Sequence, residues 1–75
     1  MQVSRFHNGG YVVHKITGPW SGSVSAWFNA EGDMIDAEQI TTRCPGGKRV
    51  NRRGSVWKIA ETIGRRFAPV YSKIA

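Results

Sequence analysis

The side chains best suited to chemistry are a run of cations in the middle of the chain. Five of the 11 Lys and Arg residues lie between positions 43 and 53, interleaved with Gly and Asn rather than with Glu. Such side chains attract phosphates, and the forked guanidinium group matches the acceptors of a phosphate or a guanine. The run therefore predicts a surface that binds nucleic acid or an acidic partner. Its residues are Arg43, Lys48, Arg49, Arg52 and Arg53.

Charge is divided unevenly along the chain, whose formal net charge is +6. Residues 1–42 carry two basic and four acidic residues, a balance of −2, whereas residues 43–75 carry nine basic and one acidic residue, a balance of +8. A field of this kind attracts polyanions and speeds their encounter. Plain solvation of a charged surface is the alternative. The second half adds three cations on a predicted helix to the predicted surface: Lys58, Arg65 and Arg66.

Two tryptophans extend the predicted surface. Residues 23–29 alternate so that Val24, Ala26 and Phe28 share one face of a strand and Trp27 lies on the other. An outward tryptophan needs a partner, and a nucleic-acid base stacked on its ring is one candidate. The other is the loop that contains Trp20, which would cover Trp27 instead. Trp27 and Trp20 are therefore candidate binding residues.

One short motif is similar to the end of a phosphate-binding loop. Gly47, Lys48 and Arg49 follow each other, but Thr42 stands where the first glycine of that motif belongs, and Arg49 where Ser or Thr belongs. The motif therefore fails at two positions. It predicts no nucleotide-hydrolysing site.

Other catalytic and metal-binding patterns are also weak. The acidic residues of 31–38 lack the ordered oxygen ligands and closing glutamate of a calcium loop. His7 and His14 have no nucleophile nearby in the sequence, and Cys44 is a lone cysteine, interpreted as a spectator thiol. We therefore expect no enzyme activity, no catalytic residues, no cofactor and no metal site.

The size of the chain limits what can position these residues. With 75 residues it forms one domain at most. It shows neither the apolar core of a signal peptide nor the length of apolar sequence that spans a bilayer. A single cysteine excludes an internal disulfide and suits a reducing compartment. The sequence predicts a cytoplasmic protein that does not bind membranes.

The first half of the chain is typical of short antiparallel strands. Residues 2–7 and 11–16 flank the turn signal Asn8-Gly9-Gly10, which predicts a hairpin. Residues 23–29 form the third predicted strand. Residues 34–41 follow a turn and can return antiparallel to the third strand.

The segment 34–41 has a competing interpretation. As a strand it would place Ile35 and Ala37 on one face, with Met34 on the other. Residues 36–39 also fit a capping box, which favours a single helical turn. The strand is the preferred prediction.

The second half predicts a loop and a helix. Residues 42–54 contain three glycines and a proline and no periodicity, which indicates an exposed, mobile loop. Ser55 is the predicted N-cap of a helix over 55–68. Its predicted buried stripe consists of Val56, Ile59, Ala60, Ile63 and Phe67. Pro69 opposes continuation, and the tail 69–75 offers a last apolar turn. The apolar residues of that turn are Val70, Tyr71 and Ile74.

Together these elements predict an α+β fold: a small antiparallel sheet of three to four strands packed on one C-terminal amphipathic helix, with the other sheet face exposed. The predicted function is a small basic nucleic-acid-binding module, of accessory or regulatory type, that uses the basic loop and the outer helix face. Contact with five to seven phosphates would give a slope of log K against log[salt] of about −4.5 to −6.

A protein-binding inhibitor or adaptor, of the kind that phages and mobile elements encode, is the alternative function. Its basic loop would meet an acidic or nucleic-acid-handling partner, and its tryptophans would anchor the interface. The opposed charges of the two halves would also allow head-to-tail self-association into a homo-oligomer.

Overall fold

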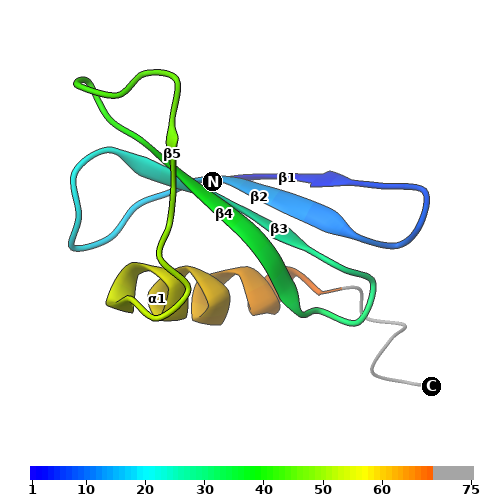
Figure 1. Ribbon diagram of the computed structural model, residues 1–75. Coiled ribbons are helices and arrows are strands. Elements are labelled where there is room, and N and C mark those ends of the chain that lie inside the picture. The colour runs from blue at the N-terminus through cyan, green and yellow to red at the C-terminus, as the bar shows by residue number, and fades with distance from the viewer. Residues whose placement is uncertain (69–75) are drawn as a thin grey trace.

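The computed structural model describes residues 1–68 as one five-stranded antiparallel sheet followed by a helix (Figure 1). The strands pair in chain order, β1-β2-β3-β4-β5. Their bounds are β1 Gln2–Arg5, β2 Tyr11–Ile16, β3 Ser23–Phe28, β4 Met34–Ile40 and β5 Lys48–Arg49. Helix α1 (Ser55–Gly64) and the short 3-10 helix η1 (Arg65–Phe67) follow, and α1 lies across one face of the sheet. The predicted α+β class is confirmed.

Two predictions concern a membrane-spanning helix and the C-terminal tail. Among residues 1–68, no helix has the length and apolar character needed to cross a bilayer. The predicted apolar turn at Val70, Tyr71 and Ile74 lies outside the described residues, as do Pro69 and the rest of the predicted tail.

The first hairpin forms where the sequence predicts it. The amide of Phe6 donates to the carbonyl of Gly10 at 2.8 Å, and the amide of Gly10 donates to the side chain of Asn8 at 2.9 Å. Gly9 has a φ of 90°, a conformation that glycine adopts without strain. Strand β1 ends at Arg5, so the turn takes two residues more than predicted.

Strand β4 replaces the competing helical turn and contains a bulge. Trp27 pairs with Asp36, whereas Phe28 pairs with Met34, so Ile35 is the extra residue. Met34 and Ala37 are consequently both buried, and Ile35 is 50% exposed. The predicted sharing of one face by Ile35 and Ala37 is wrong, because the bulge shifts the alternation by one residue.

A fifth strand lies in the segment predicted as a loop. Lys48 pairs with Gln39 and Arg49 with Glu38, so β5 extends the sheet beyond β4. The pair of cations has no apolar alternation and owes its conformation to this cross-strand pairing. The sheet therefore has one strand more than the upper predicted number.

The helix begins with a different cap than predicted, and Trp57 and Gly64 join the predicted residues Val56, Ala60, Ile63 and Phe67 against the core. Gly54 is the N-cap and makes no side-chain hydrogen bond, while Ser55 is the first helical residue. The α-helix ends at Gly64, so the predicted helix over 55–68 is too long. Its buried residues are Trp57, Ala60 and Gly64. Of the predicted stripe, Ala60 is buried, while Val56, Ile59, Ile63 and Phe67 are half-buried.

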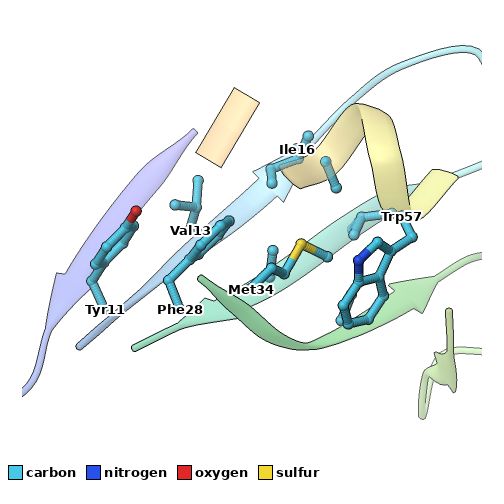
Figure 2. Close-up of a cluster of buried hydrophobic side chains, with 10 residues drawn as sticks. Tyr11, Val13, Ile16, Phe28, Met34 and Trp57 are labelled. Carbon is cyan, nitrogen blue, oxygen red and sulfur yellow. The ribbon is translucent and has the colours of Figure 1, made fainter. Parts of the chain in front are cut away.

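The core lies between the sheet and α1 (Figure 2). Tyr11 and Phe28 stack with ring centroids 4.9 Å apart, and both are at most 1% exposed. The hydroxyl of Tyr11 donates to the carbonyl of Gly64 at 3.1 Å, which satisfies a carbonyl at the end of α1. Trp57 covers the other end of the core, beside Met34 and Ile16.

Replacing Tyr11 by phenylalanine should alter the pH dependence of stability. Burial raises the pKa of Tyr11 above 10.0, although Arg5 and Arg65 oppose this shift. The folded state therefore holds the proton more tightly, so this contribution to stability is complete below pH 10 and is lost as the pH rises further. Because Tyr11→Phe removes the hydrogen bond of the hydroxyl, its free energy of unfolding at pH 7 should be about 1 kcal/mol lower than that of the wild type.

Urea unfolding of both proteins between pH 7 and 11 measures this effect. The difference in unfolding free energy between wild type and Tyr11→Phe should shrink above pH 10, because only the wild type has this buried phenol to ionise. Groups common to both proteins cancel in the comparison. A difference that stays constant over the whole range would contradict the assignment.

Candidate functional site

Two adjoining hollows follow the β5 edge of the sheet. The first has a volume of about 500 Å³ and the second of about 330 Å³. They share Gln39 and Lys48, a cross-strand pair, so we treat them as one edge groove. The first hollow is lined by Ser21, Gln39, Thr41, Thr42, Arg43, Cys44 and Lys48. The second is lined by Gln39, Lys48, Arg49, Val50, Asn51, Gly54, Ser55 and Val56.

The lining of the edge groove is positive and mixes polar with apolar groups. It contains the cations Arg43, Lys48 and Arg49, hydroxyl and amide side chains, and Val50 and Val56, and among residues 1–68 no carboxylate lines either hollow. The nearest acidic residue along β4 is Glu38, whose side chain occupies the space beside Gly47 where a Cβ would stand. This groove therefore offers hydrogen-bond donors and positive charge to an anion.

The groove is shaped by hydrogen bonds from segments far apart in the sequence. The side-chain amide of Gln39 donates to the carbonyl of Ser21 at 2.8 Å, which ties β4 to the loop before β3. The turn after β4 closes on itself, since the amide of Cys44 donates to the hydroxyl of Thr41 at 3.0 Å. Arg43 lies at the tip of this turn and is exposed.

The second hollow reaches the beginning of α1. Ser55 and Val56 line it, and Gly54 caps the helix without a side-chain acceptor. The first turn of α1 contains no acidic residue. The partial positive charge of the helix N-terminus therefore adds to the field of Lys48 and Arg49.

Arg52 is exposed and contacts the edge of the core rather than lining the groove. Its guanidinium lies 4.9 Å from the centroid of the Trp57 ring, and Nη2 donates to the carbonyl of Ile35 at 2.7 Å. The carbonyl of Ile35 is part of the β4 bulge, so Arg52 ties that bulge to the helix. These contacts give Arg52 a structural role, whereas the sequence predicted only a binding role for it.

Replacing Arg52 by alanine should destabilise the fold by about 1–2 kcal/mol, because a cation–π contact and a charged hydrogen bond are both lost. Arg53→Ala is the matched control, since Arg53 is exposed and also loses one positive charge. Its effect should stay within about 0.5 kcal/mol. Urea denaturation of both variants measures the difference, and equal stability would contradict the role of Arg52.

The remaining predicted cations are spread along the molecule. Arg53 follows Arg52 in the turn before α1, and Lys58 is exposed one turn into the helix. Arg65 and Arg66 lie at the other end of α1, about 15 Å from its start for a helix of ten residues. Arg65 Nη2 lies 3.8 Å from Glu61 Oε2 and 4.0 Å from Asp33 Oδ1. The structure therefore does not bring Arg65 and Arg66 into the edge groove.

The two tryptophans lie in different environments. Trp27 is half-buried on the sheet face that α1 leaves uncovered, between its cross-strand neighbours Val12 and Asp36. Trp20 packs against the core, its ring lies against Gly18, and its buried indole nitrogen has no hydrogen-bond partner among residues 1–68. Trp20 thus fills the helix-covered side rather than covering Trp27.

Sequence reasoning missed the neutral residues of the groove. Gln39 and Ser21 contribute through the pairing of β4 with β5 and through a hydrogen bond across the sheet. Thr41 contributes by closing a turn. The pairing of β4 with β5 leaves no local pattern in the sequence, because β5 is only two residues long. The hydrogen bond between Gln39 and Ser21 joins residues far apart in the sequence.

The structure and the comparisons with known proteins add no catalytic or metal-binding assignment. Within residues 1–68, no three His, Cys, Asp or Glu side chains are grouped so that they could hold a metal ion. Comparison with known protein families, with curated proteins and with solved structures found no match to this chain. A functional proposal therefore depends on the geometry and charge of the site itself.

Proposed function

We propose that this protein is a small nucleic-acid-binding module, of accessory or regulatory type, that holds the phosphate backbone in the edge groove. One observation carries the proposal: two adjoining hollows are lined by Arg43, Lys48 and Arg49 together with hydroxyls and amides, and by no carboxylate of the residues that the structure describes. A lining of this kind supplies charge and hydrogen-bond donors to successive phosphates.

Each cation of the groove suits a different contact. Arg43 and Arg49 can donate two parallel hydrogen bonds to one phosphate, whereas Lys48 acts as a point charge where the two hollows meet. Hydroxyl and amide groups fix the register of the backbone without reading its sequence. We therefore propose binding with little sequence preference and no catalytic step.

Fluorescence anisotropy with labelled random duplex and single-stranded DNA of about 20 nucleotides tests the proposal. We expect saturable binding to at least one of them at 50 mM salt, displaced by an unlabelled competitor of the same kind. Non-specific affinities are typically in the range of about 10⁻⁴–10⁻⁶ M near physiological salt, so micromolar protein is sufficient at 50 mM. No binding at 100 µM protein would overturn the proposal.

A protein partner is the second candidate, and a different surface favours it. The uncovered sheet face carries Trp27, and Phe6 and Ile35 are 44% and 50% exposed. Aromatic anchors of this type dominate protein interfaces. An inhibitor or adaptor would capture its partner stoichiometrically. Capture should then be lost in Trp27→Ala and retained when Arg43 and Lys48 are neutralised. Nucleic-acid binding in the edge groove predicts instead a large loss of affinity when Arg43 and Lys48 are neutralised.

A further inference from the structure

Strand β2 contains a bulge whose backbone is strained. Val13 pairs with Ala26 and Ile16 with Val24, so His14 and Lys15 together oppose the single residue Ser25. Lys15 has a φ of 58°, and among residues 1–68 it is the only non-glycine residue with a positive φ. An L-residue in this region is strained, and such strain is concentrated at functional sites. The bulge therefore calls for an explanation.

The bulge determines where the side chain of Lys15 lies. In a regular strand, Lys15 would follow the outward His14 and face the helix. Because of the bulge, Ile16 takes the fully buried position and Lys15 borders a hollow on the uncovered face. This arrangement brings a cation to a sheet face that the helix does not cover.

The hollow, which we call the bulge hollow, contains groups that can bind an anion, beside the apolar Ile40. Its volume is about 430 Å³, and Lys15 and His14 line it together with the hydroxyls of Ser4, Ser23 and Ser25. Ser4 Oγ lies 3.5 Å from His14 Nε2, at the limit of a hydrogen bond. Within the described part of the chain, no carboxylate lines the hollow. One ammonium group and three hydroxyls suit the oxygens of a phosphate.

The bulge hollow adjoins the edge groove. Ser23 and Ile40 line the hollow, and Ser21 and Thr41, close to them in the chain, line the groove. The two sites thus meet around one end of the β3–β4 pair. A chain of phosphates can pass from one to the other without crossing an acidic lining.

Trp27 lies beyond the bulge hollow on β3, on the side away from the edge groove. It is two residues beyond Ser25 on the same face of β3, about 7 Å along the strand. The carboxylates of this face belong to β4: Asp36 pairs across from Trp27, and Glu38 pairs across from Ser25 and Arg49. Their repulsion disfavours a path across the middle of β4, so the phosphate chain reaches the edge groove around the end of the β3–β4 pair where Ser23 pairs with Ile40.

We propose that the bulge hollow binds a backbone phosphate of single-stranded nucleic acid, whose neighbouring base stacks on Trp27 and whose chain continues into the edge groove. This inference rests on the proposed function and narrows it to one ligand class. Stacking on Trp27 requires a base that is free of its own helix, which a duplex does not offer along its length. The order Trp27, bulge hollow, edge groove defines the path of the strand.

Substitution of Lys15 gives the test a specific signature. Lys15→Gly removes the cation and also relieves the positive φ, so the melting temperature should stay equal to that of the wild type or rise by a few degrees. Affinity for an eight-nucleotide single strand of mixed sequence at 50 mM salt should nevertheless fall about five- to tenfold. Lys58→Ala loses the same charge elsewhere and should change affinity less than twofold. Lys15→Asn repeats the test with another residue that tolerates this conformation.

Amide and indole chemical shifts of the ¹⁵N-labelled protein locate the strand in the same titration. We expect shifts at Ser4, His14, Ser25 and the Trp27 indole as well as along the edge groove. Shifts confined to the groove, or unchanged affinity of both Lys15 variants, would overturn this inference and leave the proposed function standing. Shifts at neither site would overturn both.

Two further outcomes would also reject the inference. Equal loss of duplex and single-strand affinity in Lys15→Gly would show that the hollow does not select single strands. Shifts on the uncovered face that depend on protein concentration without any oligonucleotide would show that a second copy of the chain occupies it.

Discussion

Replacing Gly64 by alanine should destabilise the protein by about 2–3 kcal/mol, although alanine favours a helix by about 1 kcal/mol over glycine. The added Cβ would clash with Cζ and Cε1 of the Phe28 ring. Phe28 cannot move aside easily, because it is 1% exposed and stacked on Tyr11. The glycine is therefore required by the close approach of α1 to β3, and its φ of −68° is ordinary for a helix.

Urea denaturation of Gly64→Ala and of a helix control measures this effect. Thr62→Ala is suitable, since Thr62 is exposed on the same helix and bonds only to the carbonyl of Lys58. The control should be neutral or slightly stabilising, because alanine has the higher helix propensity. A Gly64→Ala protein as stable as the wild type would mean that α1 does not approach β3 as closely as described.

Replacing Arg43 and Lys48 together by glutamate should weaken binding to random single-stranded DNA about 100-fold at 100 mM salt. Each charged contact contributes roughly 1.5 kcal/mol, and tenfold in affinity corresponds to about 1.4 kcal/mol. Both residues are exposed, and Lys48 borders both hollows of the groove. The fold should be retained, since neither side chain forms a hydrogen bond or ion pair among the described residues.

The matched control is the double substitution Lys58→Glu and Arg66→Glu. It changes the net charge by the same amount, but both residues lie on or beside α1, outside the linings of the groove. We expect a loss of less than about fivefold from this pair, caused by the weaker overall field. Equal losses in the two double variants would show that net charge, or the outer helix face, governs binding rather than the groove.

Elements with local patterns could be predicted from the sequence. The alternation of Val24, Ala26 and Phe28 lies within one segment, and so does the turn signal at residues 8–10. The structure contains both the strand β3 and the β1–β2 hairpin that these patterns predict. The bulges at Lys15 and Ile35 could not be predicted, because neither position carries the glycine that often marks one. Trp57 was missed because the rotation of α1 against the sheet is set by tertiary packing, which buries Trp57 and Gly64 beside the predicted Ala60.

The site was predictable only as a basic segment. Which cations share a surface depends on the pairing of β5 with β4, and this pairing leaves no alternation to detect. Arg52 has the same residue type and neighbourhood as Arg53, yet it packs on Trp57. Likewise, Arg65 lies beside Glu61, as its i,i+4 spacing indicates, but its approach to Asp33 depends on the tertiary fold.

The dependence of affinity on salt concentration tests the central claim most directly. If the phosphate chain contacts the three groove cations, with one more contact from the neighbouring Arg53, the slope of log K against log[salt] for duplex DNA should be about −2.7 to −3.6. For single strands, with about 0.7 counterions released per contact, it should be about −2.1 to −2.8. A slope near zero with retained affinity would contradict binding through phosphates in the edge groove.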